Sequence, residues 1–268
     1  MHVRPAADED LPAIATIAAA NDEEAGADPR YVSHLRNNGR FLVAVAEAGA
    51  RAGGGLAGYC GIRRTDEYTM LTDLFVDPER HGGGAGRRLL DRALDEPGEL
   101  LTFASRDPRA MSLYVRFGMI PRWPLLYLSG PPVRSRVLRV DRLPLAEAGA
   151  AEIELTGRDR TPDYAYWATK PDATGLAVRD GDAVVAVGAI GQDKVHHLVT
   201  ADDHDPAATL AAALGAFEVG RVSVCLPGPH PALPALLEAR WRIEDLDQHL
   251  SSRPDLLSTG SVLSPSLA

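Results

Sequence analysis

Short apolar runs and helically spaced apolar residues alternate along the first half of the chain. The runs have strand length and are rich in β-branched or aromatic residues. They lie at 3–5, 41–46, 56–63, 69–76, 100–104 and 122–128. Helices are predicted between them, each with an apolar face, at 11–20, 29–37, 84–95 and 108–117. This alternation predicts an α/β (α+β) fold in which helices flank a mixed β-sheet.

The second half continues the alternation with less regular spacing. Strands are expected at 175–178, 183–190, 196–199 and 222–226, with a last one ending near 251. Helices are expected at 206–217 and 230–240. The Gly130-Pro131-Pro132 stretch is typical of a boundary. We therefore expect a first domain at 1–130, a linker at 131–150 and a second domain at 151–268. The tail at 252–268 has no clear period and is expected to be extended or partly disordered.

The two halves share a register. Val76 and Val199 each end a predicted strand before a loop and a helix, and they lie 123 residues apart. The helices that begin near Asp107 and His230 have the same separation of 123 residues. One offset kept across two motifs favours an internal duplication, hence two tandem sheets flanked by helices. Two unrelated α/β segments that happen to align are the alternative.

Charge and composition narrow the function classes. The formal net charge of −9 argues against a nucleic-acid partner, which calls for a basic face. No apolar run is long enough for a transmembrane helix, and no signal peptide is evident, so we expect no membrane partner. Cys60 and Cys225 are the only cysteines, and two buried thiols fit a cytoplasmic protein. The Asp and His residues near 202–205 are expected to be solvated, not to bind a metal.

The stretch VDPERHGGGAGRRLL, which begins at Val76, places four glycines between a strand and a helix. The N-terminus of a helix binds anions, and glycines let a phosphate approach the backbone closely. A P-loop would need a Lys after Gly86, and the glycine spacing does not match a dinucleotide fingerprint. A plain strand-to-helix turn is the remaining alternative, although four glycines are more than a turn requires.

This stretch resembles the acetyl-CoA motif of the GCN5-related N-acetyltransferases, the GNAT family. A strand ending in Val76 is followed by Pro78, by Gly84 and Gly86, and by a Leu-rich helix. The later stretch DPRAMSLYVRFGM is similar to the family's second motif through Ala110, Leu113, Tyr114 and Gly118. Departures are His81 at a usual Gln or Arg, Asp107 at a usual Asn and Met119 at a usual Phe. The resemblance covers about residues 2–130.

The resemblance implies that acetyl-CoA is the cosubstrate. It implies a thioester carbonyl polarised by the backbone near Val76 and a pyrophosphate held by the glycine loop. The positions expected to contact acetyl-CoA are Leu74, Phe75, Val76, His81, Gly82, Gly83, Gly84, Ala85, Gly86, Arg87, Asp107 and Arg109. Tyr114 matches the residue that gives a proton to the departing thiolate, although it could also be a packed aromatic residue.

Asp73 lies three residues before Val76 and is expected to bind the amine or to take its proton. An exposed carboxylate without a role is the alternative. At the 123-residue offset the glycines become Asp205, Ala207 and Thr209, and Tyr114 becomes Leu237, so we expect a degenerate second half without acetyl-CoA.

The implied activity is N-acetylation of a primary amine, on a small molecule or on a peptide or protein. A non-catalytic acyl-CoA-binding or regulatory module is the alternative. We expect the chain to be a monomer or a homodimer.

Overall fold

The computed structural model describes residues 1–23, 28–47, 55–105, 107–133 and 137–268. The chain forms two compact units. The first contains Met1–Phe103, Asp107–Ile120 and Leu250–Leu256, and the second contains Ala104–Arg106, Pro121–His249 and Leu257–Ala268. The Gly53-Gly54-Gly55 stretch, whose composition predicts a flexible hairpin loop, lies partly outside the described residues.

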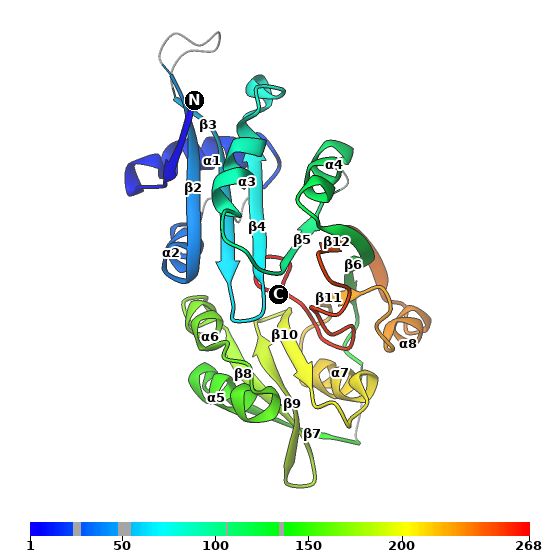
Figure 1. The fold of residues 1–268 in the computed structure, drawn as a ribbon. Helices are drawn as coiled ribbons and strands as arrows, with labels where there is room; N and C mark the ends of the chain where they lie inside the picture. The colour runs from blue at the N-terminus through cyan, green and yellow to red at the C-terminus, as the bar shows by residue number, and fades with distance from the viewer. Residues whose placement is uncertain (24–27, 48–54, 106, 134–136) are drawn as a thin grey trace. The chain divides into compact units, whose positions relative to one another are not determined.

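The first unit is built on a mixed sheet (Figure 1). Its strands follow the order β1-β2-β3-β4-β5. Their bounds are β1 His2–Pro5, β2 Gly39–Ala46, β3 Gly55–Arg64, β4 Thr69–Val76 and β5 Leu100–Ala104. Neighbours pair antiparallel except β4 and β5, which are parallel. The predicted strands of this half are therefore present, and the α/β class with a mixed sheet is confirmed.

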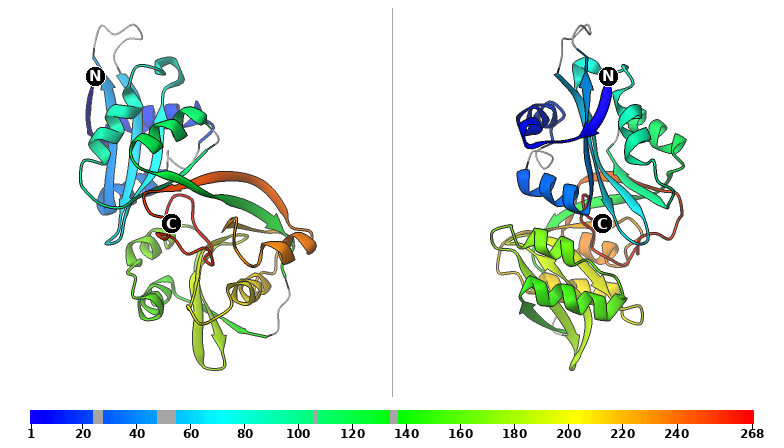
Figure 2. Two further views of the ribbon diagram at one scale, coloured as in Figure 1. Left: turned by 45° about the vertical axis from the view of Figure 1, so that its right-hand side comes forward. Right: turned by 60° about the vertical axis from the view of Figure 1, so that its left-hand side comes forward.

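Helices cover both faces of this sheet, as the right-hand view of Figure 2 shows. Their bounds are α1 Leu11–Ala19, α2 Pro29–Asn38, α3 Ala85–Ala93 and α4 Pro108–Arg116. A Cβ built on Gly61 would lie 2.8 Å from Leu35 of α2, whereas one on Gly58 would lie 3.4 Å from Leu89 of α3. Because side chains three apart on a strand face opposite ways, α2 and α3 pack on opposite faces.

The second unit holds an antiparallel sheet in the order β10-β9-β8-β7. Its strands are β7 Arg139–Leu143, β8 Thr174–Asp180, β9 Ala183–Ile190 and β10 Val195–Thr200. Strand β6, Ile120–Gly130, lies between β11, Val222–Pro227, and β12, Arg242–Ser251. The helices are α5 Leu145–Thr156, α6 Thr161–Trp167, α7 Pro206–Gly215 and α8 Leu233–Glu238.

The order of helices and strands is the same in the two halves of the chain. The first half reads β1-α1-α2-β2-β3-β4-α3-β5-α4-β6, and the second reads β7-α5-α6-β8-β9-β10-α7-β11-α8-β12. The tandem arrangement inferred from the 123-residue offset is thus confirmed. The sequence did not predict β7, α5 or α6, and the range expected to be a linker contains β7 and the start of α5.

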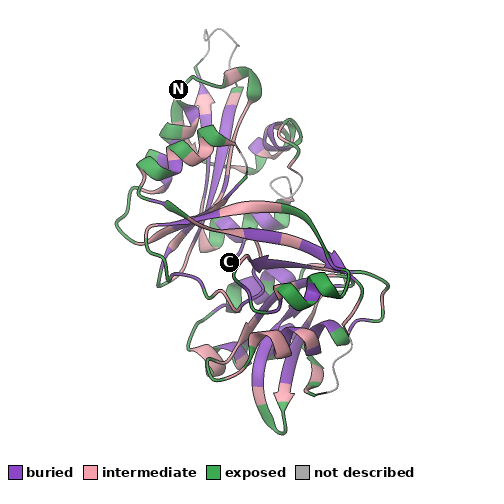
Figure 3. Ribbon diagram, turned by 90° about the vertical axis from the view of Figure 1, so that its right-hand side faces the viewer, coloured by how far each residue is buried: buried purple, intermediate pink, exposed green. Residues whose placement is uncertain are grey.

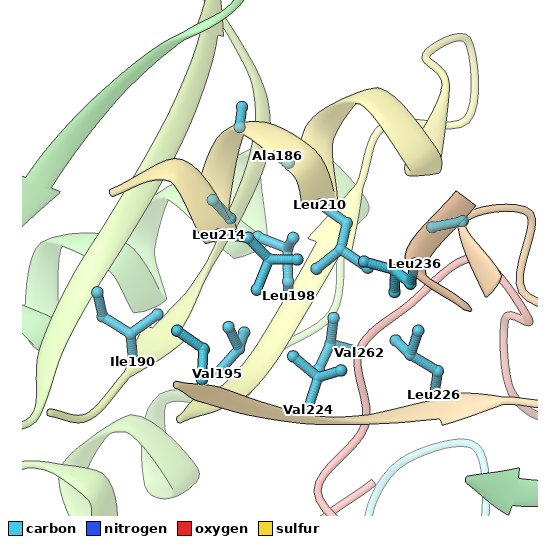
Figure 4. Packing of buried hydrophobic residues seen from close by; sticks show 14 of the residues in the cluster. Ala186, Ile190, Val195, Leu198, Leu210, Leu214, Val224, Leu226, Leu236 and Val262 are labelled. Atoms are coloured by element: carbon cyan, nitrogen blue, oxygen red, sulfur yellow. The ribbon is translucent and has the colours of Figure 1, made fainter. Parts of the chain in front are cut away.

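Apolar residues from several elements form the core of the second unit (Figure 4). Leu198 of β10, Leu210 of α7 and Leu236 of α8 meet Val262 of the C-terminal segment there. Figure 3 colours the chain by burial: buried positions lie mainly on the strands, and exposed positions lie on the outer sides of the helices.

The tail has little regular secondary structure, as its lack of a period suggests, but the expectation of partial disorder is wrong, because this segment completes the core. Val262 donates its amide hydrogen to Leu198 O at 2.9 Å, and Leu263 donates to Cys225 O at 3.0 Å. Both side chains are buried. The burial of a few spaced apolar residues, and not a helical or strand period, orders the tail, so a search for periodicity could not detect it.

A buried carboxylate joins α5, α6 and β10 in the second unit. Glu152 lies 3.0 and 3.1 Å from Nε2 of His197 through its two oxygens. It also accepts a hydrogen bond of 2.7 Å from the Tyr164 hydroxyl. Burial alone would raise the pKa of Glu152, but His197 and the hydrogen bonds hold that pKa below its usual value. The ionised carboxylate therefore ties the helices to the sheet.

Replacing Glu152 by Ala should lower the free energy of unfolding by about 3–5 kcal/mol, because the partners stay buried without their acceptor. Urea denaturation measures the change. Glu154→Ala is the matched control, since Glu154 is exposed on the same helix and should change little. Equal effects of the two substitutions would contradict the structural role of Glu152.

Candidate active site

A β-bulge in β4 shapes the site. Leu71 lies opposite Ile62 and Asp73 lies opposite Gly61, so Thr72 is an extra residue on β4. A bulge of this kind bends the strand and redirects the side chains next to it. The pairing of β4 with β5 ends at the same place. Their parallel register runs from Thr69 opposite Leu100 to Leu71 opposite Thr102, and Thr72 follows directly.

Beyond the bulge, β4 offers backbone groups at the edge that faces β5. Asp77 donates its amide hydrogen to Ala57 O on β3 at 3.0 Å. Because donors alternate along a strand, the N–H groups of Leu74 and Val76 point away from β3, toward this edge. The carbonyl oxygen of Val76 already has contacts with Asn21 Nδ2 at 3.3 Å and His81 Nε2 at 3.2 Å. The Val76 amide is therefore, with that of Leu74, a backbone donor placed toward the opening.

The glycine loop leaves the N-terminus of α3 uncapped. Gly84 is the N-cap residue with φ 78°, and no side chain caps the helix. Gly82, at φ 79°, has the same left-handed conformation, which favours glycine. The N–H groups of the first turn, from Ala85 to Arg87, have no intrahelical acceptor. This end of the helix can therefore bind an anion.

Gly86 brings that helix end close to β4. A Cβ on Gly86 would lie 3.6 Å from Val76 Cγ2, 3.9 Å from Leu74 Cδ2 and 3.8 Å from Leu113 Cδ2. Two other predicted loop amides are used within the turn, since His81 donates to Pro78 O at 3.4 Å and Gly83 donates to Arg80 O at 3.3 Å.

Asp107 and Arg109 lie at the start of α4. Asp107 caps this helix by accepting from the Arg109 amide at 2.9 Å, and the Arg109 guanidinium pairs with the same carboxylate at 2.7 Å. The Arg109 hydrogen bond holds the pKa of Asp107 below its usual value. Arg109 Nη1 also lies 3.2 Å from His81 Nδ1, so one cationic group stands beside the glycine loop.

Tyr114 is buried on α4, with 6% of its surface exposed. Burial raises the pKa of its hydroxyl, and the nearby Cys60, Asp107 and Asp73 raise it further. The phenol therefore keeps its proton at neutral pH and can act as a donor. Among the described residues its hydroxyl has no hydrogen-bond partner.

Asp73 is a buried carboxylate directly after the bulge. Its Oδ2 accepts hydrogen bonds from the Tyr31 hydroxyl at 2.7 Å and the Thr72 hydroxyl at 2.6 Å. Burial raises the pKa of Asp73 to about 6, although both hydrogen bonds oppose the rise. A Cβ on Gly61 would lie 2.8 Å from Asp73 Oδ2, so glycine is required opposite the carboxylate.

The predicted site residues divide between the two faces of the sheet. Leu74 and Val76 lie on the α3 face with Gly86, whereas Asp73 lies on the α2 face with Tyr31. Phe75 also points to the α2 face, where its ring lies 5.4 Å from that of Tyr59. Arg87 is exposed and pairs with Asp91 at 3.7 Å, pointing outward from α3.

Sequence reasoning missed the hydroxyl partners of Asp73. Tyr31 lies 42 residues away on α2. Its position in the sequence indicates only that it belongs to the buried face of an amphipathic helix. No local pattern marks Thr72 as a partner, because the bulge that turns its hydroxyl to Asp73 depends on pairing with β3.

The second unit keeps the bulge but changes the chemistry around it. In β10, Val195 lies opposite Ile190 and His197 opposite Ala189, so His196 is the extra residue. His197 thus takes the place of Asp73. Helix α7 is capped, since Asp205 accepts from the Ala207 amide at 2.9 Å.

No group of three His, Cys, Asp or Glu side chains in the described part of the chain is arranged to hold a metal ion. Within the same residues, no helix has both the length and the apolar character required to cross a membrane.

Comparison with known proteins identifies the domain. Residues 37–119 match the family model for an acetyltransferase (GNAT) domain. This range of the chain contains the bulge, the glycine loop and α4. A search of curated proteins finds no match. The resemblance read from the sequence is confirmed, and a domain of this family indicates acyl transfer from acyl-CoA in general.

Solved structures share the fold along nearly the whole chain. A putative acetyltransferase from Pyrococcus horikoshii has a TM-score of 0.73 at 16% identity, over 99% of this chain and 95% of its own. A GCN5-related N-acetyltransferase from Sphaerobacter thermophilus has a TM-score of 0.59 at 16% identity, over 96% and 97%. A tandem GNAT protein from the clavulanic acid biosynthesis pathway has a TM-score of 0.62 at 14% identity, over 96% and 99%.

The pKa of Asp73 predicts how stability depends on pH. Its folded-state pKa of about 6 exceeds the value of about 3.9 expected for an unfolded chain. The folded state therefore binds more protons at Asp73 in this interval, and the contribution of Asp73 to the free energy of unfolding should fall by up to about 3 kcal/mol as pH rises from about 4 to about 6. Denaturation in urea at several pH values measures this fall.

Asp73→Asn should remove most of that pH dependence, because an amide does not titrate. Asp66→Asn is the control, since Asp66 is exposed at the turn before β4. If both variants keep the slope of the unchanged protein, Asp73 is not the titrating group.

Proposed function

Since residues 37–119 form an acetyltransferase (GNAT) domain, we propose that the chain transfers an acetyl group from acetyl-CoA to a primary amine. The opening of β4 from β5 beyond the bulge supports this proposal most directly. It leaves a backbone donor at Val76 with an anion-binding helix end on one face of the sheet. A buried base lies on the other face.

The residues that fit acetyl-CoA are those of the glycine loop and the end of β4. The uncapped N–H groups of α3 hold the pyrophosphate, and Arg109 adds positive charge beside His81. The Val76 amide donates to the thioester carbonyl oxygen, where negative charge develops during attack.

Asp73 acts as the general base. With a pKa of about 6, it is largely ionised at neutral pH yet basic enough to accept the proton of an ammonium group, directly or through a water molecule. The neutral amine attacks the carbonyl carbon, its nitrogen releases a second proton to solvent, and the carbon–sulfur bond breaks. Tyr114 gives its proton to the departing thiolate and regains one from solvent, and the proton on Asp73 leaves to solvent.

The second unit is proposed to bind no acetyl-CoA. Its equivalent helix end is closed by the Asp205 carboxylate, which takes the amide that an anion would need. Further carboxylates at Asp202 and Asp203 repel a pyrophosphate. Leu237 stands at the 123-residue offset from Tyr114 and has no proton to give.

Calorimetry should find one acetyl-CoA per chain. Gly84→Asp places a carboxylate beside the N-terminus of α3, at a left-handed position that also strains the loop, and should weaken binding at least about tenfold by repelling the anion. Asp205→Ala is the control and should leave the stoichiometry at one. Two sites per chain, or unchanged affinity in Gly84→Asp, would contradict this assignment.

The release of free CoA thiol across a panel of amines tests the activity. The panel includes small diamines, amino sugars, amino acids and peptides with free N-terminal or lysine amines. Tyr114→Phe should lower turnover on an active amine about 100-fold with an unchanged Kd for acetyl-CoA, because only proton donation is lost. Val115→Ala, on the exposed side of the same helix, is the control. CoA binding without thiol release on any amine would instead favour a non-catalytic acyl-CoA-binding module.

A further inference from the structure

The first unit closes one end of its sheet with arginines. Arg40, at the start of β2, pairs with Asp95 at 2.5 Å and also with Glu96, and it donates to the carbonyl of Arg92 at 3.0 Å. Arg64, at the end of β3, pairs with Glu96 as well. Two guanidinium groups therefore fill the space between the strand ends and the loop after α3.

Strand register identifies the same place in the second unit. Arg40 lies opposite Ile62 in the first sheet, and Thr174 lies opposite Ile190 in the second. Ile62 and Ile190 each precede the bulged pair of their sheet, so they are equivalent. Thr174 therefore stands where the first unit has Arg40.

The other members follow from the same alignment. Gln192 lies two residues beyond Ile190, as Arg64 lies two beyond Ile62. Glu218 lies three residues after the end of α7, as Glu96 lies three residues after the end of α3. The second unit thus keeps a carboxylate and lacks both arginine side chains that pair there in the first.

A cavity of about 480 Å³ occupies this place in the second unit, within the size range of small-molecule sites. Residues that line it include Arg142, Asp172, Thr174, Gln192, Phe217 and Glu218. Neither Asp172 nor Glu218 has an ion pair within the described residues. Arg142 donates to Ala216 O at 3.2 Å and has further N–H groups for another acceptor.

We propose that this cavity binds a small guanidinium compound that also carries a carboxylate, such as free arginine. Its guanidinium takes the place of the missing arginine side chains and pairs with Glu218 and Asp172, because this planar group matches carboxylates with two hydrogen bonds. Its carboxylate pairs with the remaining N–H groups of Arg142. The cavity is thus a second ligand site, separate from the proposed acetyl-transfer site in the first unit.

Calorimetry on the full chain with L-arginine tests this proposal. Saturable binding is expected, and agmatine, which lacks the carboxylate, should bind about tenfold more weakly because it cannot pair with Arg142. Glu218→Gln should weaken arginine binding by about tenfold. Thr174→Arg should abolish binding by supplying the guanidinium from the chain itself.

Glu238→Gln is the matched control, because Glu238 is exposed on α8 away from the lining residues. Urea denaturation should give an unchanged free energy of unfolding for every variant, which shows that each one folds. The absence of saturable arginine binding would overturn the proposal. Arginine binding that persists unchanged in both Glu218→Gln and Thr174→Arg would also overturn it. Equal affinity for agmatine and arginine would contradict the role given to Arg142.

Discussion

The bulge at Thr72 is the local feature on which the candidate active site depends. One extra residue on β4 bends the strand where its pairing with β5 ends, and so opens the edge of the sheet. It also brings the Thr72 hydroxyl onto the buried carboxylate of Asp73. Gly61 makes this possible, because any side chain there would collide with both groups. The bend of β4, the open strand edge with its backbone donors, and the position of Asp73 therefore all depend on this one bulge.

The features that could be predicted from the sequence are those that depend on neighbouring residues. The turn from Val76 to α3 follows from glycines that adopt left-handed conformations and from a helix that begins directly after them. The start of α4 follows from Asp107 as a capping residue. These features need only neighbouring residues, so the motifs located the helix end and the strand end that the structure brings together.

Features that depend on distant partners were not predicted. The hydrogen bond from Tyr31 to Asp73 joins α2 to β4, and no local pattern encodes it. Helix α5 was missed because Gly149 lowers its helical signal. The same glycine lets Tyr164 of α6 come close, since a Cβ built on Gly149 would lie 3.2 Å from the Tyr164 ring. The glycine that weakens the local signal is therefore also a point of close contact between the two helices.

Comparison of the two units shows how one fold supports different chemistry. Both sheets keep the bulge, since it belongs to the path of the strand, but the buried residue after it is Asp73 in one and His197 in the other. Within the described residues, the hydrogen bonds to the Asp73 side chain come from hydroxyl groups, and burial raises its pKa. In the second unit the buried carboxylate is that of Glu152, and its contact with His197 holds its pKa below the usual value. An uncompensated carboxylate beside an open strand edge remains available to a ligand proton, whereas a compensated pair serves packing. This difference in local charge balance, and not the shared backbone, assigns the proposed chemistry to the first unit.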